Sequence, residues 1–224
     1  GEKEYDIRII KPEIKKADKE LAKKLHTNPM IAKSLKIIED LVAEKKTIIF
    51  VNTRELAENL GSRFQMLNNK TIGVHHGSLS KDSRLSIEDQ FKNGEIKGII
   101  ATSSLELGID IGDIEQVIQY NSPRQANKLI QRVGRAGHTS DQVSHGVIIT
   151  TSEQEYQESK AILNKVGKKW VEESESYHKP LDVLATQIVG YCLSNYKPRL
   201  KEVYEVLTRA KPYQGLTWSE FMEV

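Results

Sequence analysis

Five short segments rich in apolar residues divide the first two thirds of the chain and predict β-strands. The first of them, Thr47-Ile48-Ile49-Phe50-Val51, is continuous rather than alternating, which is typical of a strand covered on both faces of a sheet. The five segments occupy residues 47–51, 71–75, 97–101, 116–120 and 146–150. A further strand-like segment, Tyr5 to Ile10, precedes them and is closed by Pro12.

Helical segments separate these strands. The spacing of apolar residues predicts helices over 31–42, 56–67 and 125–135. Ser80 is a suitable N-cap for another helix, which runs to Asn93 and stops at Gly94. The lysine-rich segment 14–26 is only weakly helical, and we expect it to be a solvated segment or an insertion.

Because strands and helices alternate, we expect an α/β fold with a parallel sheet and helices on both faces. In such sheets ligands bind beyond the carboxyl ends of the strands. Polar clusters follow the strands there, at residues 52–54, 76–78, 102–104 and 122–124. Hydroxyls, amides and arginine suit a phosphodiester backbone. Ordinary capping and turn chemistry explains any single cluster equally well, so the residues alone leave both interpretations open.

The helix predicted over 125–135 has two faces. Its apolar positions, Ala126, Leu129, Ile130 and Val133, form one stripe at helical spacing. We expect the opposite face to present Lys128, Gln131, Arg132 and Arg135 together. Planar guanidinium groups suit bidentate contact with phosphate, although a solvated basic face on a surface helix is the commoner case.

Composition narrows the protein class without naming a partner. The chain has 224 residues, of which 38% are hydrophobic and 29% charged, and its net charge of +2 neither requires nor excludes nucleic acid. No apolar run approaches the ~20 residues of a membrane helix, and the charged start resembles no signal peptide. A single cysteine, Cys192, excludes an internal disulfide and favours an intracellular location. Its apolar helical surroundings predict a buried position. The histidines show no metal-ligand spacing, so no metal site is expected.

The pattern changes after about residue 152. A helix is expected over 152–165, and the acidic, polar segment 170–177 has the composition of a linker. A new helix starts near Lys179, with an apolar stripe at Leu181, Leu184, Ile188 and Cys192. Two more helices are expected around Val203 and Thr217. We therefore divide the chain into domains 1–172 and 173–224.

Two motifs together resemble motifs V and VI of superfamily 2 helicases and translocases. They read ATSSLELGIDIG at 101–112 and QRVGRAGH at 131–138, and their wording is most similar to the Lhr (large helicase-related) and Ski2-like groups. Phe50-Val51-Asn52-Thr53-Arg54 resembles motif IV, and His75-His76-Gly77-Ser78 resembles the region that follows it. The later pattern P-L-D-V-L-A-x-Q-I-V resembles the start of a winged-helix domain, of which only the helical part is present.

The resemblance implies a second RecA-like domain, with an interdomain linker at its start, and a role for each motif. The nucleic-acid contacts it implies are Asn52, Thr53, Arg54, His76, Gly77, Ser78, Thr102, Ser103 and Ser104. The residues it places beside ATP are Gly108, Asp110, Gln131, Arg132 and Arg135. Of these, Arg135 and Arg132 would be catalytic, reaching the ATP phosphates. His138 stands where many relatives have arginine, as it commonly does in Lhr-like proteins.

Two motifs of such helicases do not occur in the sequence: the G-x-x-x-x-G-K-[ST] loop and the D-E-x-H box. Both belong to the first RecA-like domain, which would hold most of the ATP and its Mg²⁺. We therefore expect a fragment of an ATP-dependent helicase, whose partners are that first domain and single-stranded or partly duplex DNA or RNA, with no membrane. A nucleic-acid-binding module without motor activity is the alternative. A nucleotide-dependent oxidoreductase is disfavoured, because no G-x-G-x-x-G follows the first strand.

The missing phosphate-binding loop generates a prediction. The purified chain should hydrolyse no ATP above background, with or without single-stranded nucleic acid, because its arginines act on a nucleotide held by another domain. Phosphate release measured over hours would test this. Turnover stimulated by nucleic acid in the verified chain would contradict its assignment as half of a motor.

Overall fold

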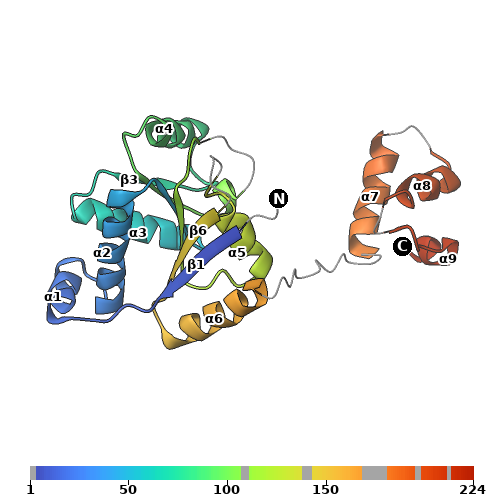
Figure 1. Ribbon diagram of the computed structural model, residues 1–224. Helices are drawn as coiled ribbons and strands as arrows, with labels where there is room; N and C mark the ends of the chain where they lie inside the picture. The colour runs from blue at the N-terminus through green and yellow to red at the C-terminus, as the bar shows by residue number, and fades with distance from the viewer. Residues whose placement is uncertain (1–3, 107–110, 138–142, 168–180, 195–197, 211–212) are drawn as a thin grey trace. The chain divides into compact units, whose positions relative to one another are not determined.

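The computed structural model describes residues 4–106, 111–137, 143–167, 181–194, 198–210 and 213–224 (Figure 1). The chain folds into two compact units, 1–172 and 173–224. Each unit has its own core of buried side chains, so each is described by itself.

A six-stranded sheet forms the centre of the first unit, with strand order β1-β6-β5-β2-β4-β3. Its strands are β1 (Glu4–Ile10), β2 (Thr47–Phe50), β3 (Ile72–His75), β4 (Gly98–Ala101), β5 (Gln116–Tyr120) and β6 (Val143–Ile149). Every neighbouring pair is parallel, which confirms the expected α/β sheet. The weak segment near the N-terminus is the edge strand β1, which pairs with β6 along its whole length.

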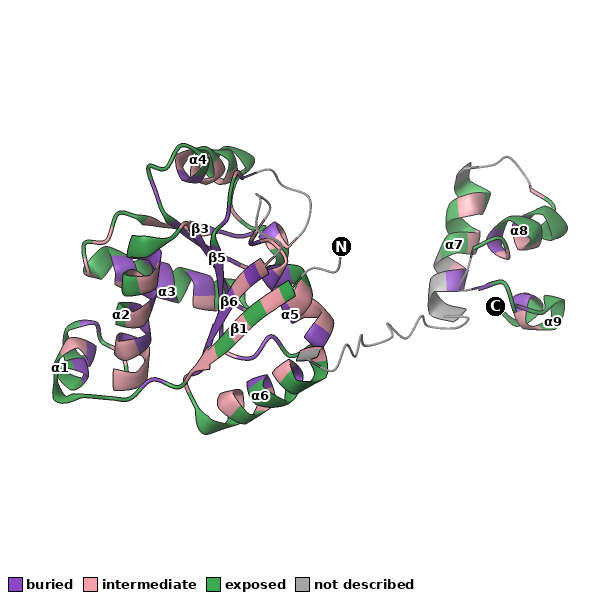
Figure 2. Ribbon diagram, in the orientation of Figure 1, coloured by how far each residue is buried: buried purple, intermediate pink, exposed green. Residues whose placement is uncertain are grey.

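The pleat of the central strands sends alternate side chains into two separate cores. In β2, Ile48 and Phe50 join one cluster, whereas Ile49 joins the other. The two clusters lie on opposite faces of the sheet, and the central strands β2, β4 and β5 between them are buried along their whole length. This burial on both faces explains why the strand sequences are continuous apolar runs. The edge strand β1 differs, with exposed and intermediate residues along it (Figure 2).

Three of the described helices cover each face of the sheet (Figure 1). On one face lie α1 (Lys16–Lys24), α2 (Pro29–Glu44) and α3 (Arg54–Met66). On the other lie α4 (Lys81–Lys92), α5 (Ala126–Val133) and α6 (Glu153–Gly167). The division follows from right-handed crossovers: the chain moves along the sheet in one direction through α3 and in the opposite direction through α4 and α5.

Helix caps confirm the start and stop signals in the sequence. Asn28 accepts a hydrogen bond from the backbone N–H of Ile31, and Pro29 occupies the first turn. Ser80 caps α4 by accepting from the N–H of Ser83. Gly94 follows that helix with a φ of 79°, a left-handed conformation that favours glycine.

The segment 14–26 was expected to be a solvated segment or an insertion. Most of its residues are exposed, but one side of it is buried, so it is not solvated throughout. Its helix α1 buries Ala22, and the following Leu25 is also buried, in the core that α2 and α3 share. Asp18 is only 6% exposed. Its carboxylate accepts from the N–H of Lys15 at 2.7 Å and lies 3.9 Å from Lys33 Nζ. The apolar residues of this segment are few among its lysines, so their periodicity is weak, and their burial depends on packing against α2.

The second unit contains helices α7 (Leu181–Ser194), α8 (Leu200–Leu207) and α9 (Trp218–Glu223). Its buried residues include Leu184, Val203, Leu207, Tyr213, Leu216 and Phe221. Cys192 is exposed, which contradicts the expected core position. Along its stripe Leu184 is buried, Ile188 is half-buried and Cys192, one turn later, is exposed. Among the described helices of the whole chain, none is long and apolar enough to cross a membrane.

The contact between α3 and β3 generates a stability prediction. A methyl group added at Gly61 would overlap a methyl of Val74. Gly61→Ala should therefore cost about 1–3 kcal/mol of unfolding free energy, as overpacking does in other cores. Urea unfolding would measure it, with Ser62→Ala, an exposed neighbour on the same helix, as the control within ±0.5 kcal/mol. In the double variant Gly61→Ala with Val74→Ala, the further loss of unfolding free energy caused by Gly61→Ala should largely disappear, because the overlapping methyl is removed. The same loss in both backgrounds would show that the overlap is not its cause.

Candidate functional site

The carboxyl ends of β4, β2 and β5 are neighbours in the sheet, although the chain visits them in a different order. From β4 the chain crosses over β2 to reach β5, which makes this edge a topological switch point, where ligands bind in open α/β sheets. The polar segments after these strands, around Asn52, Thr102 and Ser122, therefore converge.

Arg132 lies at the centre of this edge and is buried, with 1% of its surface exposed. Its Nε and one terminal nitrogen both lie 2.8 Å from the same oxygen of Glu106. Its other terminal nitrogen donates to Gln119 at 2.8 Å and to Asn52 at 3.2 Å. The guanidinium carbon stands 5.1 Å from the ring centre of Phe50. One side chain thus joins α5 to β2, to β5 and to the segment that follows β4.

The expectation that Arg132 shares the outer face of its helix is wrong. At about 100° per residue, Arg132 lies roughly 60° from Leu129 around the helix, beside the apolar stripe. Leu129 and Val133 are buried, whereas Ile130 is only half-buried, so the buried arc of α5 is rotated toward Arg132. The outer face keeps Lys128 and Arg135, both half-buried, together with the exposed Gln131.

Burial lowers the pKa of Arg132, and the hydrogen bonds that Arg132 donates to Glu106 oppose that shift. Arginine nevertheless stays protonated in proteins, so the centre holds a buried ion pair. In this conformation the donors of Arg132 are engaged by acceptors of the protein itself.

Asn52 extends this network to the segment after β5. While its side-chain oxygen accepts from Arg132, its nitrogen donates to the carbonyl of Ser122 at 2.8 Å. The N–H of Ser122 in turn donates to Glu155 on α6 at 2.7 Å. Asn52 is therefore occupied on both sides of its amide, and its role among the expected nucleic-acid contacts would be to hold the loops.

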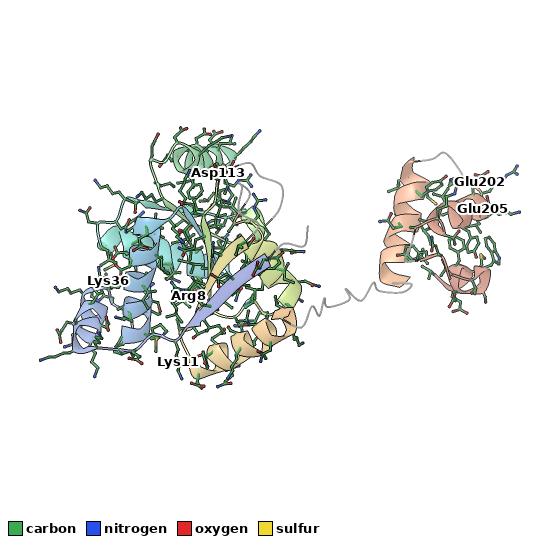
Figure 3. The ribbon with its side chains drawn as sticks, in the orientation of Figure 1. Arg8, Lys11, Lys36, Asp113, Glu202 and Glu205 are labelled. Atoms are coloured by element: carbon green, nitrogen blue, oxygen red, sulfur yellow. The ribbon has the colours of Figure 1, made fainter. Side chains whose placement is uncertain are left out.

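Arg124 closes this side of the edge. It has a positive φ of 69° and donates to Glu155 and Glu158 of α6, both at 2.6 Å. The hydrogen bond to Glu155 raises the pKa of Arg124. Lys11, which follows β1, pairs with Glu153 at the start of α6. Figure 3 shows Lys11 at the end of β1, beside that helix. The start of α6 is thus tied to this edge at several points.

The two histidines at the end of β3, His75 in the strand and His76 after it, bind different partners. His75 is fully buried and contacts Glu88 and Ser104. His76 contacts Glu58 on α3. They do not share a ligand set, and no group of three metal-ligating side chains occurs among the described residues.

Arg54 and the segment after β3 meet at the surface. Arg54 is exposed and donates to the hydroxyl of Ser78 at 2.9 Å, so motif IV and the segment after β3 form one surface. Thr53 uses its hydroxyl to cap α3, accepting from the N–H of Leu56 at 3.2 Å. Gly77 is exposed, and a Cβ there would meet nothing within 4 Å, so an extended backbone could approach.

A single turn of 3-10 helix, η1 (Ser103–Leu105), follows Thr102 after β4. Ser103 is exposed and Thr102 half-exposed, whereas the Ser104 hydroxyl points inward to His75 at 2.9 Å. The expected triplet of hydroxyls is therefore split between an outward pair and an inward anchor. Gly108, Asp110 and His138 lie outside the described residues.

The acceptors that hold these groups were not predicted from the sequence. Glu106, Gln119 and Glu155 are all essential to the network, and none was a candidate. Gln119 carried a usable signal, because a polar residue inside an otherwise buried strand needs a buried partner. The partners of Glu106 and Glu155 are distant in sequence, and no local pattern indicates them.

Comparisons with known proteins identify one family. Residues 31–140 match the helicase conserved C-terminal domain family. The chain is 34% identical over 231 residues to the ATP-dependent helicase Lhr-Core of Methanocaldococcus jannaschii, covering 99% of this chain and 26% of that protein. It is 35% identical over 193 residues to Lhr-Core protein 2 of Thermococcus barophilus, covering 84% of this chain and 22% of that protein. The chain thus spans about a quarter of the length of these relatives.

Solved structures give the same family. Helicase Lhr of Mycobacterium smegmatis, bound to ssDNA and AMP-PNP, superposes with a TM-score of 0.84 and 29% identity, over 98% of this chain and 29% of that one. Dbp5 of S. cerevisiae, bound to RNA and ADP BeF3, has a TM-score of 0.55 at 22% identity over 77% of this chain and 41% of that one, which shows the fold alone. The chain therefore belongs to the superfamily 2 helicases and carries their C-terminal, second RecA-like domain in a form similar to that of the Lhr group.

Proposed function

We propose that this domain grips a single-stranded nucleic-acid backbone at the carboxyl edge of its sheet and presents Arg135 to ATP held by a first RecA-like domain. The observation that supports this most is the convergence on the buried Arg132 of three acceptors, which come from the segment after β4 (Glu106), from β5 (Gln119) and from the segment after β2 (Asn52). The network fixes the positions of these segments before a ligand arrives, and preorganised contacts lose less entropy on binding.

The proposed backbone contacts are the exposed groups of this edge. Arg54 and Ser78 supply a cation and a hydroxyl that already lie together, and Thr102 and Ser103 supply hydroxyls from the next segment. His76 and Gly77 line the path between them in this proposal. Such groups recognise phosphate and sugar without reading sequence. Because the similar helicase Lhr was solved with ssDNA, single-stranded DNA is the first substrate to test.

On the nucleotide side, we propose Arg135 as the catalytic residue and Arg132 as its positioning partner. Both were expected to reach the ATP phosphates, but Arg132 is enclosed by Glu106, Gln119 and Asn52. Arg135 follows α5 directly and is half-buried, so it keeps a side on which a phosphate could be met. Gln131, Gly108 and Asp110 complete the proposed nucleotide side. ATP, bound with Mg²⁺ mainly by the first domain, supplies the free energy through hydrolysis of its terminal phosphate.

A nucleic-acid-binding module without motor activity is the alternative. It would need the same edge contacts and the same buried network, so neither discriminates between the two functions. The presence of Gly108, Asp110, Arg132 and Arg135, which the motif resemblance places beside ATP, supports the motor interpretation. The DNA or RNA preference of the complete protein is open to direct comparison of matched strands.

The exposed edge generates a binding prediction for this chain. It should bind single strands weakly and without sequence preference, with log affinity falling as log salt rises. Arg54→Ala should reduce that slope by about 0.7, because one cation contact is lost. Thr102→Ala should lower affinity by about 2- to 10-fold, the net value of one hydrogen bond, and leave the slope unchanged.

Fluorescence anisotropy of a labelled oligonucleotide over a salt series would measure both effects. The matched control is Arg8→Ala, an exposed arginine on the outermost strand β1, which should change neither quantity (Figure 3). Binding that does not depend on salt would place the contact elsewhere. So would unchanged binding by the double variant Arg54→Ala with Thr102→Ala.

Arg135 and Arg132 should differ in what they support. In the complete enzyme, Arg135→Ala should lower ATP turnover by about 10³- to 10⁵-fold while single-strand affinity stays within a few-fold. Arg135→Lys should rescue poorly, because lysine lacks the planar fork. Arg132→Ala should instead lower the unfolding free energy of this chain by about 3–5 kcal/mol, because Glu106 is left buried and unpaired.

Steady-state turnover, oligonucleotide affinity and urea unfolding separate these roles. If Arg135→Ala kept more than a tenth of normal turnover, the finger role would be rejected for Arg135. A large loss of single-strand affinity in the same variant would assign this face to nucleic acid instead.

A further inference from the structure

The ring of His75 joins helix α4 to the turn η1. His75 is the last residue of the edge strand β3 and is fully buried. Its Nε2 lies 2.7 Å from a carboxylate oxygen of Glu88 on α4. Its Nδ1 lies 2.9 Å from the hydroxyl of Ser104 in η1. The same hydroxyl is 3.3 Å from the backbone carbonyl of His75. His75 therefore offers two acceptors to one short turn of the proposed single-strand site.

The chemistry of the partners fixes the direction of these hydrogen bonds. An ionised carboxylate only accepts, so Nε2 must carry the hydrogen that Glu88 receives. In a neutral ring Nδ1 then has only a lone pair, and the Ser104 hydroxyl must donate to it. Because that hydroxyl has one hydrogen, it cannot donate to the carbonyl of His75 at the same time. Glu88 thus selects the tautomer, and the tautomer holds Ser104.

Within the described part of the chain, few other contacts hold the turn η1. A 3-10 helix has poorer hydrogen-bond geometry than an α-helix and is used only in short pieces. Within the turn, the N–H of Glu106 donates to the carbonyl of Ser103 at 3.1 Å. Leu105 is buried in the core and Glu106 is bound to Arg132, so the turn is anchored at its end. Ser104 is the anchor nearest to the exposed hydroxyls of Thr102 and Ser103.

We propose that His75 is a positioning residue for the single-strand site: through Nδ1 it holds Ser104, and so keeps the Thr102 and Ser103 hydroxyls directed toward the nucleic-acid backbone. This rests on the proposed function of the edge. It makes the contact on Nδ1 the one that matters for binding, while the contact on Nε2 acts by choosing the tautomer. Ser104 itself becomes an internal anchor rather than a phosphate ligand.

Two substitutions of His75 separate the two ring nitrogens. The amide atoms of asparagine lie as many bonds from Cα as Nδ1 does, so His75→Asn can still reach Ser104. The amide atoms of glutamine match Nε2, so His75→Gln can still reach Glu88 but not Ser104. Each variant keeps one of the two hydrogen bonds and loses the other. A purely structural role would therefore affect both alike.

The test uses the 224-residue chain and a labelled single-stranded DNA of mixed sequence. His75→Gln and Ser104→Ala should each weaken binding by about fivefold, within the roughly 2- to 10-fold range expected for one lost hydrogen bond. His75→Asn should stay within about twofold of the unchanged chain. The double variant His75→Gln with Ser104→Ala should bind no more weakly than either single variant, because both remove the same contact. The salt slope should stay unchanged in all of them, unlike in Arg54→Ala, because no cation is removed.

Hydrogen exchange at the N–H of Glu106 provides a second readout that needs no nucleic acid. It should be faster in His75→Gln and Ser104→Ala than in His75→Asn, while the thermal midpoints of the two His75 variants should agree. Equal binding by His75→Gln and the unchanged chain would overturn the proposal. Equal losses in both His75 variants would also overturn it, since they indicate a structural role. If the unchanged chain bound no single strand, the proposed function would fail, and the exchange rates alone would decide whether His75 holds η1.

Discussion

The buried ion pair between Arg132 and Glu106 is the constraint on which the functional edge depends. Removing a guanidinium and a carboxylate from water costs several kcal/mol per ion, and only close, well-satisfied geometry offsets it. Here the required acceptors come from the segment after β4, from β5 and from the segment after β2. If any of these segments moved far, the buried guanidinium of Arg132 would lose an acceptor in an apolar interior. The charge of one side chain therefore holds the loops in place.

The same network connects the interior of the domain to its last helix. Asn52 accepts a hydrogen bond from Arg132 and donates one to the carbonyl of Ser122, and the N–H of Ser122 donates to Glu155 on α6. A displacement of α5 would therefore strain the hydrogen bonds that lead to Glu155 on α6. These contacts form one continuous set of hydrogen bonds, which is the physical condition for coupling, although coupling itself is a matter of measured energies.

Polar side chains at the edge divide into two kinds. Some are consumed by the protein: Thr53 caps α3, and Ser104 binds His75. Others, such as Arg54 and Ser103, face solvent. The consumed groups hold the backbone of the loops, and the exposed groups are left for a ligand. Ordinary capping chemistry and a phosphate-binding edge were rival interpretations of the sequence. The structure shows capping at Thr53 and leaves other polar residues of the same segments exposed, which the proposed phosphate contacts require.

The sequence by itself determined the architecture. Continuous apolar runs such as Thr47–Phe50 could only be strands covered on both faces, and their alternation with helices required a parallel sheet. Caps such as Ser80 and stops such as Gly94 were also readable, because they act through neighbours within four residues. The motifs at 101–112 and 131–138 indicated the family and the edge at which the chemistry lies.

Tertiary structure decided which polar groups are available at that edge. Arg132 and Arg135 lie three residues apart in one motif, yet the first is enclosed by acceptors from distant segments. Cys192 and the helix α1 were misjudged for the same reason: a helical pattern shows which residues share a face but not what covers it. Periodicity is a local property, whereas burial and hydrogen-bond partners depend on segments brought together by the fold, and those partners decide whether a side chain holds the protein together or meets a ligand.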